Sequence, residues 1–205
     1  MIEAGIPPGL RLNSPELISA AQHLAVEEGV TNRVEFRVGD AQSLEDESEK
    51  YDAVIAHTVV SHVPDPIKVV SEAARVVKPG GLVTIFDGDY ASLTFATGDH
   101  EFDAEMVQII LSLVVANSYI MRELPVILRE AGLQIANFYS NVLAEVGVGH
   151  FFSNLAESYV PMVVKAQLIP EERAENWLNA FQQASSSESV FASCNYYTYI
   201  ARRPV

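Results

Sequence analysis

The stretch Tyr51–Tyr90, YDAVIAHTVVSHVPDPIKVVSEAARVVKPGGLVTIFDGDY, decides the fold that this sequence predicts. It begins with a short apolar run of strand length, 51–56, and ends with a second such run, 82–86. Between them, apolar residues recur at helical spacing over 67–77, and the Lys-Pro-Gly-Gly sequence at 78–81 ends that helix. Two apolar strands joined by one helix predict a parallel β-α-β unit that is buried on both faces.

Polar residues follow both strands of this unit. His57 and Thr58 come directly after the first strand, and Asp87 and Asp89 come after the second. Open α/β sheets bind ligands at the carboxyl ends of their parallel strands. We therefore expect the functional site at this edge of the sheet.

The remaining chain alternates between segments of helical and strand pattern. A proline near the start of a helical pattern and a glycine after its end mark several of the boundaries. The expected elements are a helix over 15–28, a strand over 33–38, a loop over 92–101, helices over 103–117 and 124–131, a strand within 133–146, helices over 151–168 and 171–184, and a last strand over 190–202. This order predicts one α/β domain over 1–205.

The two helices within about 149–184 interrupt the last two strands, so we expect them to form a small cap or an interface. The apolar stripe on the first of them includes Phe152 and Tyr159, and its spacing predicts packing rather than cofactor binding. Cys194, the only cysteine, lies in a strand pattern and is expected to pack inertly.

Composition excludes several classes of partner. The 205 residues carry a formal net charge of −14, which argues against binding nucleic acid or an anionic membrane surface. A single cysteine excludes an internal disulfide. The start of the chain does not read as a secretory signal, and no apolar run is long enough to span a bilayer. These features predict a soluble, cytoplasmic protein.

Several short motifs, taken in order, resemble one family. Gly-Asp-Ala at 39–41 follows a strand pattern, YDAVIAH fills 51–57, RVVKPGG fills 75–81, and LREAGL fills 128–133. This order resembles the class I S-adenosylmethionine-dependent methyltransferases, and especially small-molecule enzymes of the ubiquinone-biosynthesis type. The resemblance implies a Rossmann-like, mostly parallel sheet with an antiparallel last strand. It also implies methyl transfer from S-adenosylmethionine to an oxygen, nitrogen or carbon nucleophile of a small molecule.

The resemblance also implies where the cofactor binds. Gly39, Asp40 and Ala41 match the segment that reads adenine, with the carboxylate accepting from the amino group and the next backbone N–H donating to a ring nitrogen. His57 and Thr58 match the strand end that lines the methionine and sulfonium side.

Five further polar residues are candidates for the acceptor side of the site. His62 has the chemistry of a general base, although a packed or capping histidine is the preferred interpretation of the sequence. Asp87 and Asp89 are candidates for base or substrate contact, and Tyr90 for the lining of the acceptor pocket. Arg122 is a candidate for binding an anionic group, with a surface ion pair as its alternative. The two histidines of this region lack a third ligand, so no metal is predicted.

The start of the chain departs from the family pattern. No Asp-x-Gly-x-Gly turn precedes the helix at 15–28, and Asn13 stands where the family has the acid that binds ribose. The expectation is an N-terminally truncated methyltransferase fold that binds its cofactor weakly or not at all. The alternatives are a non-catalytic methyltransferase-like partner, whose free strand edge leaves a homo-oligomer open, and a dinucleotide oxidoreductase, which the absence of Gly-x-Gly-x-x-Gly disfavours.

Overall fold

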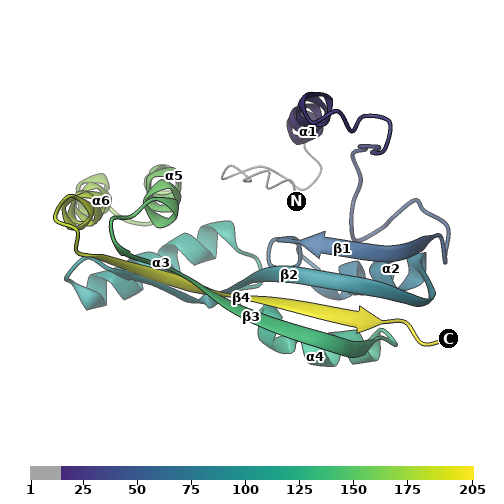
Figure 1. Ribbon diagram of the computed structural model, residues 1–205. Coiled ribbons are helices and arrows are strands. Elements are labelled where there is room, and N and C mark those ends of the chain that lie inside the picture. The colour runs from purple at the N-terminus through teal and green to yellow at the C-terminus, as the bar shows by residue number, and fades with distance from the viewer. Residues whose placement is uncertain (1–14) are drawn as a thin grey trace.

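The computed structural model describes residues 15–205, and the side chains from residue 18 onward. Asn13 and the glycines and prolines before it therefore lie outside the described residues. Figure 1 shows an elongated molecule in which helices lie on both sides of one long sheet. The elements in chain order are α1 (Pro15–Glu27), β1 (Tyr51–His57), α2 (Pro66–Val76), β2 (Val77–Ala96), α3 (His100–Val114), α4 (Ile120–Glu130), β3 (Gln134–Gly147), α5 (Phe151–Lys165), α6 (Glu171–Ser186) and β4 (Val190–Arg202).

The sheet has the spatial order β1-β2-β4-β3. β1 pairs with β2 in parallel, and β4 pairs antiparallel with both β2 and β3. Three strands therefore run in one direction, and only the last strand of the chain runs against them. The predicted α/β class, Rossmann-like and mostly parallel with an antiparallel last strand, is confirmed.

Local chemistry sets the two ends of α2. The Asp65 carboxylate accepts from the backbone N–H of Lys68 at 3.2 Å, and Pro66 occupies the first turn, where a missing N–H costs nothing. The helix ends at Val76, and the chain turns through Gly80 at φ +80°. Gly81 allows a close approach, because a Cβ there would lie 2.7 Å from the carbonyl oxygen of Asp52 in β1. The predicted glycine stop is confirmed, and it lets β2 lie directly beside β1.

Two hydrophobic clusters fill the interior. In the first, α2 and α4 pack on one face of the sheet, where Val83, Ile85 and Ala201 are buried. In the second, α3, α5 and α6 surround the other half of the sheet, and Phe95 meets the rings of Phe152, Trp177 and Phe181 edge to face. α5 and α6 thus stand over the half of the sheet where β2, β4 and β3 extend beyond β1 (Figure 1).

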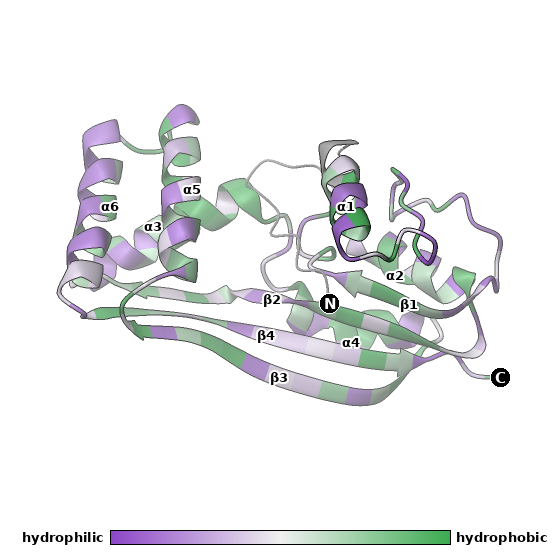
Figure 2. Ribbon diagram, turned by 45° about the horizontal axis from the view of Figure 1, so that its top comes forward, coloured by the Kyte–Doolittle hydropathy of each residue, from purple (hydrophilic) through white to green (hydrophobic). Residues whose placement is uncertain are grey.

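Helix α6 packs against the second hydrophobic cluster through one face. Its buried residues, Ala174, Trp177, Phe181 and Ala184, are spaced three or four apart, so they share one helical face. Figure 2 shows a largely hydrophilic ribbon along the rest of α6. The two helices predicted at 151–168 and 171–184 are confirmed, whereas their status as a cap or an interface stays a prediction.

The strand predicted over 33–38 is wrong. Residues 33–38 form no strand, and the side chains of Val34 and Val38 are 39% and 50% exposed. Strict alternation favours a strand only where a neighbouring strand accepts its hydrogen bonds, and no described strand lies beside this segment.

The loop predicted over 92–101 is also mostly wrong. β2 continues to Ala96 because Thr94, Phe95 and Ala96 pair with β4 after an irregularity that follows Asp89. The next helix begins earlier than predicted, at His100, and ends at Val114. Within 15–205, no helix is both long and apolar enough to cross a membrane.

Candidate functional site

The chain makes a sharp turn at the end of β1, and a backbone hydrogen bond ties this turn to β2. His57 pairs with Phe86, and the next backbone N–H, of Thr58, donates to the carbonyl of Phe86 at 2.8 Å. Thr58 has φ +51°, which is unfavourable for a β-branched residue. Its hydroxyl donates to the carbonyl of His57 at 2.8 Å. The two predicted residues thus form a sharp turn at the carboxyl end of the strand.

The Gly39–Ala41 segment is a loop that hydrogen bonds hold against α2. One carboxylate oxygen of Asp40 accepts from the backbone N–H and the side-chain amide of Gln42, at 2.9 and 3.2 Å, and these bonds lower the pKa of Asp40. The Gln42 side-chain oxygen accepts in turn from the backbone N–H of Asp65, at the start of α2. The second oxygen of Asp40 and the N–H of Ala41 bond to no described residue.

Asp87 is enclosed and fully engaged. Its carboxylate accepts from the backbone N–H and the hydroxyl of Ser61, at 3.0 and 2.9 Å, and from the N–H of Gly88 at 2.8 Å. Burial raises the pKa of Asp87, while the bonds from Ser61 act in the opposite direction. The geometry makes Asp87 a support of the turn after β1; its predicted role as a base stays a prediction. The sequence did not indicate a role for Ser61, because only the fold brings Ser61 next to Asp87 of β2.

His62 has one ring nitrogen engaged and one without a described partner. Its Nδ1 lies 3.1 Å from the carbonyl oxygen of Val114, the last residue of α3. A carbonyl only accepts, so Nδ1 carries a hydrogen, and in the neutral ring Nε2 then holds the lone pair. The ring also packs edge-on against Tyr90, with 5.6 Å between the centroids. The arrangement is compatible with His62 as a general base through Nε2, and that role stays a prediction.

Arg122 forms the ion pair that was the alternative to substrate binding. Its Nε lies 3.0 Å from both carboxylate oxygens of Asp89, and its Nη2 lies 2.9 Å from one of them. Asp89 is buried, whereas the Arg122 side chain is half exposed and lies over the ring of Tyr119. The hydrogen bond to Asp89 raises the pKa of Arg122. Both predicted charges are therefore already paired with each other.

An aromatic row lies on the sheet beside these residues. Phe86 stacks on Tyr196 with 5.6 Å between centroids and an interplanar angle of 13°, and His57 lies 4.7 Å from Phe86. Tyr196 was predicted only as part of the last strand. The signal that identifies it is its pairing with Gly88, which no local sequence pattern reveals.

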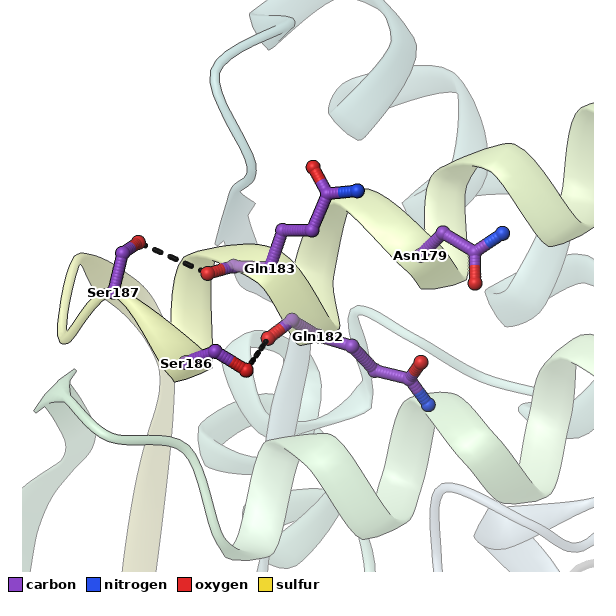
Figure 3. Close-up of a pocket in the computed structure, with 5 residues that line it drawn as sticks. All are labelled: Asn179, Gln182, Gln183, Ser186 and Ser187. Atoms are coloured by element: carbon purple, nitrogen blue, oxygen red, sulfur yellow. Dashed lines mark hydrogen bonds between the residues drawn. The ribbon is translucent and has the colours of Figure 1, made fainter.

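Two further features of residues 15–205 bear on the site, the possible metal ligands and a surface hollow. No group of three or more His, Cys, Asp or Glu side chains there is placed to hold a metal ion. Figure 3 shows a hollow on α6 whose lining is only amides and hydroxyls. Two of these hydroxyls, on Ser186 and Ser187, donate to helix carbonyls, so the hollow offers no acid, base or nucleophile pair. Its lining residues are Asn179, Gln182, Gln183, Ser186 and Ser187.

Several known proteins are similar to this chain in sequence. A family described as a methyltransferase domain matches residues 13–85. The 27-O-demethylrifamycin SV methyltransferase of Amycolatopsis mediterranei is 35% identical over 121 residues, which are 59% of this chain and 43% of that protein. This chain spans between 20% and 48% of the length of the curated relatives that it matches.

Solved structures are similar in fold. The YcgJ protein of Bacillus subtilis has a TM-score of 0.55 and 19% identity, covering 94% of this chain and 81% of that one. The geranyl diphosphate C-methyltransferase of Streptomyces coelicolor A3(2), solved with Mg²⁺, geranyl diphosphate and S-adenosyl-L-homocysteine, has a TM-score of 0.52 and 16% identity. That likeness covers 93% of this chain and 66% of the other.

Proposed function

We propose that this chain carries a class I methyltransferase domain and that it transfers a methyl group from S-adenosylmethionine to an oxygen, nitrogen or carbon nucleophile of a small molecule. Two comparisons support a small-molecule acceptor and S-adenosylmethionine as the methyl donor. The rifamycin relative is a methyltransferase of a small molecule by name. The geranyl diphosphate enzyme was solved with S-adenosyl-L-homocysteine, which is what S-adenosylmethionine becomes after it gives up its methyl group.

The observation that carries the proposal is the open acceptor and donor at Asp40 and Ala41. Adenine presents an amino group that donates and an adjacent ring nitrogen that accepts. The second Asp40 oxygen and the Ala41 N–H have the complementary chemistry, and the Gln42 bonds hold them on one rigid loop. The residues present therefore fit the adenine end of the cofactor, with the Thr58 turn beside the same edge of the sheet.

The chain's own residues supply positioning and a proton acceptor. S-adenosylmethionine supplies an electrophilic methyl group when bound. Nε2 of His62 accepts the proton that an acceptor hydroxyl or amine loses, while the Val114 carbonyl keeps the hydrogen of the imidazole on Nδ1. Asp87 holds Ser61, the neighbour of His62, and so fixes the turn that carries the base. A role for Arg122 in binding an anionic acceptor stays a prediction, since its described partner is Asp89.

A second candidate is a methyltransferase-like chain that binds partners without catalysis. The observation that favours it is the free edge of β1, because β1 pairs only with β2 among the described strands. Such a chain would bind no cofactor at Asp40, so one titration separates the two functions.

Calorimetric titration with S-adenosylmethionine tests the proposal. We expect weak, saturable binding that Asp40→Asn reduces about tenfold, which is the loss expected for a charge-assisted hydrogen bond. The matched control is Asp52→Asn, which removes an exposed carboxylate paired only with Lys78 at the far end of β1. Absence of binding by the unaltered chain, or equal effects of the two substitutions, would contradict the proposed site.

A further inference from the structure

Two tyrosine rings converge over a glycine on β2. Gly88 pairs with Tyr196 of β4, and a Cβ added to Gly88 would lie 3.1 Å from two ring atoms of Tyr90 and 3.3 Å from one of Tyr196. That distance is tighter than ordinary van der Waals contact, so a side chain at Gly88 would push both rings away. The glycine therefore permits Tyr90 and Tyr196 to lie together beside His62 and Phe86.

A third tyrosine, on α5, packs against the same hydrophobic cluster as this pair. Tyr159 packs with Tyr90 and Tyr196 against the second hydrophobic cluster. Burial raises the pKa of all three hydroxyls. At neutral pH each of them is therefore an uncharged hydrogen-bond donor.

The three hydroxyls are open rather than sealed. None of them bonds to a described residue, and none of the three residues is exposed overall. Within 15–205, no side-chain oxygen or nitrogen that is fully buried lacks a partner. Each hydroxyl therefore reaches solvent from a largely buried ring, as a ligand-facing group does.

The charged groups around this tyrosine cluster already have hydrogen-bond or ion-pair partners. Asp87 is engaged by Ser61 and Gly88, and Asp89 is engaged by the guanidinium of Arg122. His62 has its Nδ1 committed to Val114. The cluster, defined as Tyr90, Tyr159 and Tyr196, thus offers aromatic surface and neutral donors but no free described charge to balance an ionic ligand.

We propose that this tyrosine cluster is the acceptor subsite, and that it selects an uncharged, mainly apolar molecule held through a hydroxyl or carbonyl oxygen. The stacked Phe86 and Tyr196 rings supply the apolar surface, and the tyrosine hydroxyls donate to the ligand oxygen. The oxygen lies beside the ring of His62, which packs on Tyr90. The inference rests on the proposed function, because it names the acceptor for that reaction.

Three small probes of similar size test the selectivity. 1-Naphthol carries a neutral hydroxyl, naphthalene lacks it, and 1-naphthoate replaces it with a charge. In calorimetric titrations of the full chain we expect 1-naphthol to bind more tightly than either other probe. Equal or tighter binding of 1-naphthoate, or no binding of 1-naphthol, would overturn the proposal.

Hydroxyl deletions then test the residues. We expect Tyr159→Phe and Tyr196→Phe each to weaken 1-naphthol binding about three- to tenfold, the effect of one hydrogen bond, and to leave naphthalene binding unchanged. Tyr139→Phe is the matched control, since Tyr139 is an exposed tyrosine of β3. Unchanged 1-naphthol binding in both cluster variants, with native thermal unfolding, would overturn the assignment. Titration of the same variants with S-adenosylmethionine separates this failure from failure of the proposed function, because cofactor binding depends on Asp40 and not on these hydroxyls.

Discussion

At the residue scale, the carbonyl of Val114 decides what His62 can do. A histidine in the loop between a strand and a helix is often only a packed side chain. The sequence left open whether His62 packs in this way or acts as a general base. The 3.1 Å contact at Nδ1 assigns the hydrogen to that nitrogen and leaves Nε2 as the proton acceptor. A backbone oxygen that is 52 positions away along the chain therefore determines the tautomer, which no local motif can show.

Asparagine at position 62 separates packing from catalysis. The amide nitrogen of asparagine occupies nearly the position of Nδ1, so His62→Asn keeps a donor for Val114 and removes only Nε2. We expect methyl transfer to fall about 10²–10⁴-fold, the range for losing a general base, while S-adenosylmethionine binding and thermal unfolding change little. A fall in activity that follows only a fall in stability would assign His62 to packing instead.

Residue types at strand ends were predictable, but their partners were not. His57 and Thr58 lie at the end of β1, as predicted, whereas Asp87 lies within β2 and Asp40 follows a segment that forms no strand. Their hydrogen bonds, such as that of Asp87 to Ser61, join positions that are far apart in sequence. Spacing therefore identifies the edge of the sheet, and only the folded chain shows which groups remain open to a ligand.

At the element scale, the segment between α1 and β1 forms no strand, and hydrogen bonds to the carboxylate of Asp46 hold it in place. Asp46 accepts from Arg37, from Lys50 at 2.7 Å and from the Tyr51 hydroxyl at 2.6 Å. Arg75 of α2 donates to the backbone carbonyl of the same residue at 2.7 Å. The prediction of a strand over 33–38 failed because these side-chain bonds, and not a strand neighbour, hold the segment in place.

This arrangement predicts a specific acid sensitivity. Hydrogen bonds from Lys50 and Tyr51 lower the pKa of Asp46 to about 2. A lowered pKa means that the folded state favours the ionised form, so its stabilisation is complete above about pH 4 and disappears as the pH falls through about 2.

Thermal unfolding between pH 7 and pH 2 measures this effect. We expect Asp46→Asn to lower the Tm at pH 7 and the difference from the unaltered chain to shrink as the pH falls from about 4 to about 2. Glu47→Gln is the control, because Glu47 is exposed and its carboxylate accepts no hydrogen bond from a described residue. A difference between the Asp46 variant and the unaltered chain that stays constant over this range would show that Asp46 acts through shape alone.

At the scale of the whole molecule, the β-α-β unit and the order of the elements were predictable because apolar runs, caps and glycine stops are local. The extension of β2 to Ala96 was not, because it depends on pairing with β4 from the other end of the chain. The same long-range pairing brings Tyr196 to Gly88 and creates the tyrosine cluster. The cofactor side of the site is thus visible in local motifs, whereas the acceptor side arises from the fold.

We expect the cofactor side and the acceptor side of the site to meet at one edge of the sheet. The cofactor loop at Asp40 and the base at His62 would then serve a single reaction. The most direct measurement incubates the full chain with S-adenosylmethionine carrying an isotopically labelled methyl group and with 1-naphthol. Labelled naphthyl ether is then quantified by mass spectrometry for the unaltered chain, Asp40→Asn, His62→Asn and the control Asp52→Asn. We expect labelled ether from the unaltered chain and the control, and a large loss in the other two. Saturating binding of both ligands with no labelled ether would contradict the claim that this chain is a methyltransferase.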